Sequence, residues 1–462
     1  MSATTAIGSL LRCTFFWLLS PMTVWGEITP NVGHSVDGIE EDLVVSLPSY
    51  GPPKTKQFAG LSAATSCGTN RLFYWFVEAD VGSSSDETPL LIWLNGGPGA
   101  SSLMGLLTEN LGPQKISHDS KLVDNVNHIT KKYHVMAVDN PVGSGFSITS
   151  TGAYVKNEEE MRAQFVYALR GFYKKHPQYA RNPLWITGES YAGKYVPNIA
   201  YEIATTAPEM PLRGVMIGNG LYNQGLQVTT IGTFAFGAGI IDENVLKEEQ
   251  AREEQCAAAI RSGKPRAGQF CENVTVRWLY EGPQAVAGEL FYYDFGMDDA
   301  DELNVITTSL GSYLDRADVK RALHVGSSAT WQNKDETGPV AQALANDFAL
   351  PSTYFVEKLL GSFYRVVMYN GVRDGSVCNH IGNLKALQSL VWPGAADFAA
   401  AQNRPWPSTS SVMGHVRVAR NLTFATIMRT GHLVPTVVPE SFSTLLGMIL
   451  DTTEEAHSTL VV

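Results

Sequence analysis

Residues 184–193 read L-W-I-T-G-E-S-Y-A-G, and the interpretation of the whole chain depends on them. The apolar and β-branched start predicts a buried strand, and the small residues that follow predict a sharp turn that carries Ser190 at its tip. Gly188 and Ala192 flank this turn, where the backbone leaves room only for small side chains. Because Ala192 departs from the common G-x-S-x-G pattern, the segment alone also fits a turn with an incidental serine.

Short β-branched and aromatic runs recur on both sides of this segment. We expect strands at residues 72–78, 90–94, 134–138, 184–187, 214–217, 364–369 and 422–428. Residues 158–175 carry apolar side chains at helical spacing behind Asn157, a favourable N-cap. Strands that alternate with helices predict an α/β fold with a mostly parallel central sheet flanked by helices.

The pattern changes after residue 220. Residues 243–259 form a charged helical pattern, and residues 262–268 form a loop of glycine, proline and basic residues. Since 462 residues are many for one compact domain, an insertion is the simplest account. We expect a core of residues 27–220 and 311–462, split by a mainly helical cap at 221–310.

The N-terminus has the pattern of a signal peptide. Arg12 precedes an apolar stretch at residues 13–19, and Gly26 provides a small residue at a cleavage site. We expect residues 1–26 to be removed, although an uncleaved anchor is the alternative. No later run of apolar residues reaches membrane length, so we expect no membrane span in the mature protein.

Cysteines and sequons agree with a secretory route. Four cysteines follow the expected cleavage site: Cys67, Cys256, Cys271 and Cys378. Cys256 and Cys271 flank a polar loop and could close it as a disulfide in an oxidising compartment. Asn273 and Asn421 begin N-x-T sequons and are possible glycosylation sites. Lysosome, vacuole and secretion all remain open as destinations.

Composition excludes several classes of function. Hydrophobic residues make up 44% and charged residues 17%, which is typical of a folded globular protein. A net charge of −11 without clusters of Lys or Arg argues against a nucleic-acid partner. The chain has no phosphate-binding glycine loop of the Walker type and no His-Glu-x-x-His zinc motif, so we expect neither a cofactor nor a metal.

A second glycine-rich segment supports a catalytic interpretation of Ser190. Residues 91–102 read L-I-W-L-N-G-G-P-G-A-S-S, a strand that runs into a loop. In an α/β-hydrolase such a loop supplies one backbone N–H to an oxyanion hole, and the residue after the nucleophile supplies the other. These donors would be Gly97 and Tyr191.

Three motifs occur together in one order. They are W-L-N-G-G-P-G at 93–99, G-E-S-Y-A-G-K-Y at 188–195 and R-T-G-H-L-V-P at 429–435. With these motifs the chain resembles the serine carboxypeptidase family from about residue 60 to about residue 439. The resemblance implies an α/β-hydrolase fold and an enzyme that releases C-terminal amino acids from peptides and proteins.

The resemblance also implies a catalytic triad of Ser190, Asp374 and His432. The order Ser, Asp, His along the chain is independently typical of α/β-hydrolases. Asp374 and His432 each follow an expected strand. His415, in the strand-like residues 412–418, is the main rival for the role of base.

A site for the substrate's C-terminal carboxylate follows from the same resemblance. Its implied residues are Trp93, Asn95, Gly96, Glu109 and Glu189. Two carboxyls held close together cannot both ionise cheaply, so at least one pKa should be raised and activity should be highest in acid. Glu109 is followed by one residue more than the family pattern has.

Other departures leave alternatives open. Ala100 stands where the family commonly has a cysteine that is tied to the insertion, so the cap must be held differently. Cys378 matches a cysteine that the family tends to keep unpaired near the site. The alternatives to a peptidase are an acyltransferase with the same triad and a non-catalytic scaffold. The preferred C-terminal residue and the oligomeric state are not predicted.

Overall fold

The computed structural model describes residues 41–80, 85–268, 271, 291–297, 301–333, 338–407 and 411–451. The expected signal peptide and Asn273 lie outside the described residues. The described residues from 42 onward belong to one compact unit. Within the described part, no helix combines the length and the apolar character that crossing a membrane requires.

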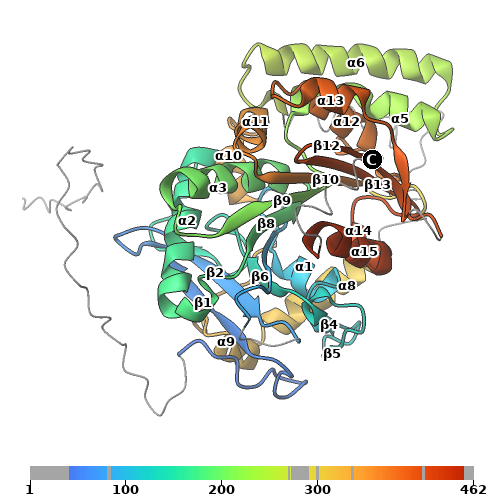
Figure 1. Ribbon diagram of the computed structural model, residues 1–462. Coiled ribbons are helices and arrows are strands. Elements are labelled where there is room, and N and C mark those ends of the chain that lie inside the picture. Colours follow the sequence, from blue (N-terminus) through green and yellow to red (C-terminus); the bar gives the residue numbers. More distant parts are fainter. Residues whose placement is uncertain are drawn as a thin grey trace, which may run out of the picture. The chain divides into compact units, whose positions relative to one another are not determined.

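An eleven-stranded sheet forms the centre of this unit (Figure 1). Its order is β1-β2-β6-β3-β8-β9-β10-β13-β12-β11, with β7 paired to β2. The six strands from β6 to β13 in this order are parallel, and the strands beyond them on both sides are antiparallel. The predicted mostly parallel sheet is therefore confirmed.

The strands of this sheet are β1 Gln57–Ala63, β2 Asn70–Val77, β3 Leu90–Leu94, β6 His134–Val138, β7 Ile148–Thr149, β8 Leu184–Glu189, β9 Leu212–Gly218, β10 Arg365–Gly371, β11 Arg404–Trp406, β12 Gly414–Ala419 and β13 Leu422–Ile427. A separate two-stranded sheet contains β4 Gln114–Ile116 and β5 Leu122–Asp124. The bounds of β3 and β6 match the sequence-based expectation residue for residue.

The described helices are α1 Leu103–Thr108, α2 Glu158–Lys175, α3 Ala192–Thr206, α4 Gln224–Gln227, α5 Ile231–Gly237, α6 Glu243–Arg261, α8 Asp301–Leu314, α9 Ala317–Ala322, α10 Pro339–Leu344, α11 Thr353–Gly361, α12 His380–Gln388, α13 Ala395–Ala400, α14 Val434–Val437 and α15 Pro439–Leu450. Short 3₁₀ turns lie at Ile129–Lys131, Pro177–Tyr179 and Val228–Thr230. The predicted cap of α2 is present, because Asn157 Oδ1 accepts the Glu160 N–H at 2.8 Å.

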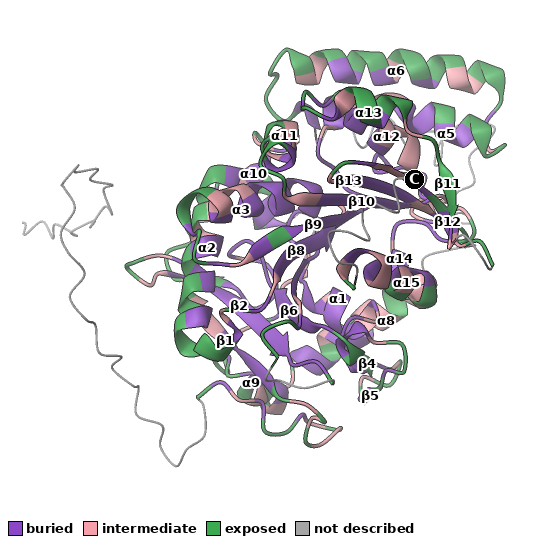
Figure 2. Cartoon of the chain, viewed as in Figure 1, coloured by how far each residue is buried: buried purple, intermediate pink, exposed green. Residues whose placement is uncertain are grey.

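The two faces of the sheet are covered by different helices, so the core has two halves. Alternate residues of β2 separate into them: Tyr74 and Phe76 pack on one side, and Phe73 and Trp75 on the other. Helices α2, α3, α11 and α12 complete the first half, and α1, α8 and α15 complete the second. Buried strands lie between helices with exposed outer faces (Figure 2). This is the expected three-layer arrangement.

A long excursion separates two neighbouring strands. Strands β9 and β10 pair in parallel, yet residues 219–364 lie between them in the chain. The described parts of this excursion are mainly helical, and α6 packs on α4 and α5. The excursion is longer than the expected cap at 221–310, whose boundaries remain a prediction.

Parallel strands bring their carboxyl ends to one edge of the sheet. Asn95 follows β3, Ser190 follows β8 and Asn219 follows β9. Asp374 lies in the loop after β10, and His432 lies after β13. Ligands bind to open α/β sheets at this edge, so the topology gathers the predicted site residues where a site is expected.

Candidate active site

The turn that carries Ser190 has the geometry of a nucleophile elbow. Ser190 has φ 61°, in the left-handed region that is strained for a residue with a side chain. Its carbonyl accepts the N–H groups of Gly193 and Leu221, each at 2.9 Å. A Cβ on Gly188 would lie 2.8 Å from the Ala192 Cβ, so the glycine leaves room for this alanine. The departure at Ala192 therefore does not prevent the turn.

Asp374 and His432 form a buried pair at the same edge. The distance from His432 Nδ1 to Asp374 Oδ2 is 2.7 Å. Asp374 also accepts the Asn219 side-chain amide at 2.7 Å and the Ser376 N–H at 2.9 Å. These three donors fix the carboxylate, which fixes the imidazole in turn.

The backbone and ring of Tyr293 hold His432 from the other side. The His432 N–H donates to the Tyr293 carbonyl at 2.7 Å, and the two ring centroids are 4.6 Å apart. Ser190 and His432 line the same cavity, whose volume is about 230 Å³. His415 instead lies exposed on β12, opposite Thr426 of β13. The structure thus brings the three predicted triad residues together and leaves the rival histidine outside this cavity.

The glycine-rich loop after β3 packs against the elbow. A Cβ on Gly96 would lie 2.4 Å from the Tyr191 nitrogen and 2.8 Å from the Ser190 Cβ, so only glycine fits there. Gly97 has φ 106° and lines the cavity beside Ser190. Tyr191 begins α3. The backbone of the loop and the start of α3 therefore meet at the serine.

Asn95 joins two buried glutamates. Its Nδ2 donates to Glu109 Oε1 at 2.8 Å and to Glu189 Oε1 at 3.1 Å. Its Oδ1 accepts the Trp93 indole at 2.9 Å and the Gly105 N–H at 3.1 Å. The two donors to Oδ1 fix which end of the amide faces the carboxyls. We call Asn95, Glu109 and Glu189 the carboxyl cluster.

The carboxyl cluster faces the cavity. All three residues line the cavity, as does Gly96, whereas Trp93 lies beneath Asn95. Glu109 Oε2 and Glu189 Oε2 accept no hydrogen bond from an N–H or hydroxyl group of the described residues, and the two carboxyls hydrogen-bond to each other, which requires a proton on one of them. A ligand that accepts hydrogen bonds can compete for that proton.

Burial makes both carboxyls weak acids. It raises the pKa of Glu109 to about 7, although the bond from Asn95 acts in the opposite direction. Burial raises the pKa of Glu189 well above its usual range, and the adjacent charge of Glu109 raises it further. The carboxyl cluster is therefore protonated below about pH 7. In that range its carboxyls do not repel a negatively charged ligand.

The extra residue after Glu109 does not displace that side chain. Glu109 caps the C-terminus of α1, and Asn110 follows in the left-handed region at φ 60°. The Asn110 amide donates to the Pro435 carbonyl at 2.9 Å. This connection anchors the turn to the loop that carries His432.

Hydrogen bonds hold the segment 331–333 to the loop around Ala100, where the family's disulfide is absent. The Ser101 N–H donates to Asn333 Oδ1 at 2.8 Å, and the Trp331 indole donates to Ser101 Oγ at 2.9 Å. Between them, the Gln332 N–H donates to the Gly145 carbonyl at 3.0 Å. Asn333 and Ala100 both line the cavity. We call residues 331–333 the clasp.

Three further residues of the sequence-based prediction lie in the described part of the chain: Cys256, Cys271 and Asn421. The thiols of Cys256 and Cys271 are buried and hydrogen-bond to each other. The two cysteines are therefore neighbours in space, and a disulfide between them stays a prediction. The Asn421 amide donates to the carbonyls of Leu360 and Tyr364 at 3.0 and 2.7 Å. A glycan would occupy one of its two amide hydrogens, so glycosylation there would cost one of these bonds.

Three residues of the site have no role in the sequence-based prediction. Asn219 holds Asp374, Tyr293 contacts His432, and Asn333 holds the loop near Ala100. Asn219 does lie in the I-G-N-G segment that supports the family resemblance, so a signal exists for its position. Tyr293 and Asn333 lie in the long excursion, where the sequence gives no comparable signal. Among the described residues, no His, Cys, Asp and Glu side chains group as a metal ion would require.

The elbow, the Asp–His pair and the sheet define a serine hydrolase of the α/β-hydrolase class. A family model described as serine carboxypeptidase matches residues 48–452. The chain therefore belongs to the serine carboxypeptidase family, and it is a hydrolase that acts as an exopeptidase on peptide C-termini.

Individual relatives agree with this assignment. The chain is 32% identical over 393 residues to serine carboxypeptidase S10 family member 1 of Dictyostelium discoideum, an alignment that covers 83% of this chain and 92% of the relative. It is 30% identical to vitellogenic carboxypeptidase of Aedes aegypti, with 83% and 81% covered. The solved structure of Kex1(delta)p, a prohormone-processing carboxypeptidase from Saccharomyces cerevisiae, matches with a TM-score of 0.77, 25% identity, and 92% and 96% covered.

Proposed function

We propose that Ser190 is the nucleophile of this carboxypeptidase, with His432 as its base and Asp374 as the residue that orients the base. Ser190 Oγ attacks the carbonyl carbon of the last peptide bond while His432 Nε2 takes the hydroxyl proton. The C–N bond then breaks, and His432 gives the proton to the leaving amine. Water, activated by the same imidazole, hydrolyses the acyl-enzyme and restores Ser190.

In this proposal the oxyanion is stabilised by the backbone N–H groups of Gly97 and Tyr191. The close approach of the Gly96 backbone to Tyr191 supports this assignment, because a side chain at residue 96 would separate the two. One such donor contributes about 10²–10³-fold to kcat in comparable enzymes.

The carboxyl cluster binds the free carboxylate of the substrate, and this recognition restricts the enzyme to C-termini. The Gly96 N–H donates a hydrogen bond. Both Asn95 Nδ2 hydrogens bind Glu109 and Glu189, so a bond from Asn95 to the substrate would replace one of these two, and Trp93 holds the Asn95 amide in place. Glu109 and Glu189 donate only when they are protonated. Since the pKa of Glu109 is raised to about 7 and that of Glu189 is also raised, acid favours binding and a rising pH replaces donors with repelling charges. The loss of activity should therefore begin as a rise in KM.

The observation that carries the proposal is that one cavity contains Ser190, His432 and the carboxyl cluster. A nucleophile beside a carboxylate site suits cleavage one residue from a chain end. A non-catalytic scaffold would not need the strained φ of Ser190 or the hydrogen bonds around Asp374. We further infer a secretory route to a lysosome or vacuole, or secretion, from the N-terminal pattern and the two sequons.

The test is hydrolysis of a blocked dipeptide with a free C-terminus at pH 4.5 and pH 7.5. Release of the C-terminal amino acid should be faster at pH 4.5, and Ser190→Ala should abolish it. A second arm adds an alcohol acceptor, because transfer to the alcohol in place of hydrolysis would favour an acyltransferase. Hydrolysis that survives Ser190→Ala would rule out the proposed nucleophile.

A further inference from the structure

A second cavity adjoins the catalytic one. It has a volume of about 440 Å³, within the range of roughly 300–1,000 Å³ that is typical of small-molecule sites. Tyr293, Leu303 and Leu433 line both cavities, so they form the boundary between them. We call the larger cavity the recess.

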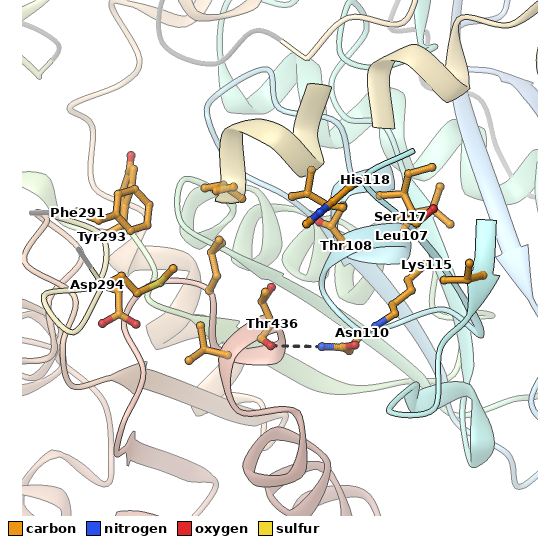
Figure 3. A pocket seen from close by; sticks show the side chains of 17 residues that line it. Leu107, Thr108, Asn110, Lys115, Ser117, His118, Phe291, Tyr293, Asp294 and Thr436 are labelled. Carbon is orange, nitrogen blue, oxygen red and sulfur yellow. Dashed lines mark hydrogen bonds between the residues drawn. The ribbon is translucent and has the colours of Figure 1, made fainter. Parts of the chain in front are cut away.

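The recess lies on the side of the active site where the departing residue must be. Thr108 and Asn110, the neighbours of Glu109, form part of its wall (Figure 3). Leu433, the neighbour of His432, forms part of the boundary. A C-terminal residue whose carboxylate binds the carboxyl cluster and whose nitrogen faces His432 would direct its side chain between these two groups, toward the recess.

The chemistry of the wall is mainly apolar. Its apolar members are Leu107, Ile116, Val123, Phe291, Tyr293, Met297, Leu303, Ile306, Leu433 and Val437. They come from α1, β4 and β5, from residues 291–297, from α8, and from the residues after His432. An apolar wall favours an apolar side chain, because burial of apolar surface stabilises a complex by about 25 cal/mol per Å² removed from water.

Charges in the wall do not favour a basic side chain. Asp294 is buried and already bound, because Arg373 Nε lies 2.8 Å from its Oδ1 and the Gly431 N–H donates to its Oδ2 at 2.9 Å. Lys115 is exposed and makes no ion pair with a described residue. Among the described wall residues, the carboxylate of Asp294 is therefore already neutralised and the charge of Lys115 would repel a basic side chain.

We propose that the recess selects a large apolar or aromatic C-terminal residue as the leaving group. This inference rests on the proposed function, and it specifies the substrate class of the same site. The opposing possibility is a preference for a basic C-terminal residue, which the acidic sequence D-D-A-D-E at 298–302 would attract. The side chains of residues 298–302 lie outside the described part of the structure.

The test compares blocked dipeptides that share one penultimate residue and end in Phe, Leu, Ala, Glu or Lys. We expect kcat/KM for Phe and Leu to exceed that for Ala by roughly tenfold or more, since even one methylene in an apolar pocket is worth about tenfold. Lys should be the poorest of the large residues.

A filling variant separates the recess from the rest of the site. Ile306 lines the recess from α8, whereas its neighbour Val305 is 46% exposed and lines neither cavity. Ile306→Trp should lower kcat/KM for the Phe and Leu substrates about tenfold and leave the Ala substrate unchanged, and Val305→Trp should change none of them. An equal loss on all substrates, a Phe substrate no better than Ala, or a preference for Lys would each overturn the inference. No Ser190-dependent hydrolysis of any substrate would instead overturn the proposed function.

Discussion

Two buried carboxyl sites have opposite surroundings: Glu109 and Glu189 line the catalytic cavity, and Asp374 lies behind His432. Asp374 accepts hydrogen bonds from His432, Asn219 and Ser376. Glu109 and Glu189 share the single amide of Asn95 and hydrogen-bond to each other. Donors around a carboxyl stabilise its charged form, and burial without donors favours its neutral form. The difference teaches that the number of donors can separate two roles, and in our proposal Asp374 orients a base and the carboxyl cluster recognises an anion.

Removing the nucleophile should give the largest effect and leave recognition intact. We expect Ser190→Ala to lower kcat roughly 10⁵-fold or more, because every covalent step starts from this hydroxyl. A blocked dipeptide should still bind to the variant at pH 4.5, as measured by calorimetry. A fluorophosphonate probe should label the wild type at Ser190 and fail to label the variant. Labelling that persists at another residue would contradict the assignment.

Changing the well-bonded carboxyl should give the next largest effect. Asp374→Asn places an amide beside His432 and the Asn219 amide, which disturbs the tautomer that catalysis requires. We expect a loss of about 10⁴-fold in kcat with little change in KM. Steady-state kinetics at pH 5 measures both constants, with a thermal melt to verify folding. A rise in KM at constant kcat would assign Asp374 to substrate binding instead.

Changing the poorly bonded carboxyls should alter the pH dependence more than the rate. Above pH 7 the wild-type KM should rise about tenfold per pH unit as the carboxyl cluster loses its proton, since one pH unit corresponds to about 1.4 kcal/mol. Glu109→Gln stays neutral at every pH, so its KM should rise less steeply. The measurement is KM from pH 4.5 to pH 8. Glu440→Gln, at an exposed position on α15, is the control and should follow the wild type.

Weakening the clasp should have the smallest effect. Asn333→Ala removes the acceptor of the Ser101 N–H, and one such hydrogen bond is worth about 1 kcal/mol, a factor of about five. We expect a fivefold loss in kcat and a decrease of about 1 kcal/mol in the free energy of unfolding. Asn333→Asp keeps the acceptor oxygen and should recover most of both. If the alanine and aspartate variants behave alike, the hydrogen bond does not position the loop.

Much of the sheet, and the position of the proposed triad residues at its edge, can be predicted because the signals are local. The runs at β3 and β6 are continuous apolar strands, and Asn157 marks the start of α2. Each triad residue follows such a strand, and parallel strands bring their ends together without further information.

The contacts that complete the site could not be predicted because they join distant segments. Asn333 and Ser101 are 232 residues apart in the chain, and Asn219 and Asp374 are 155 residues apart. Their side chains carry no periodicity that would reveal a partner. The recess combines distant segments, at residues 107–123, 291–297, 303–306 and 433–437, so its shape depends on the folded excursion.

The central claim is that protonated carboxyls recognise the substrate's carboxylate. The most direct test compares a blocked dipeptide acid with its C-terminal amide from pH 4 to pH 8. Both substrates need Ser190 and His432, and only the acid presents an anion to the carboxyl cluster. We predict that the ratio of their kcat/KM values, acid over amide, is highest in acid and falls as pH rises through about 7, the region of the raised pKa of Glu109. A ratio that stays constant over this range would contradict the claim.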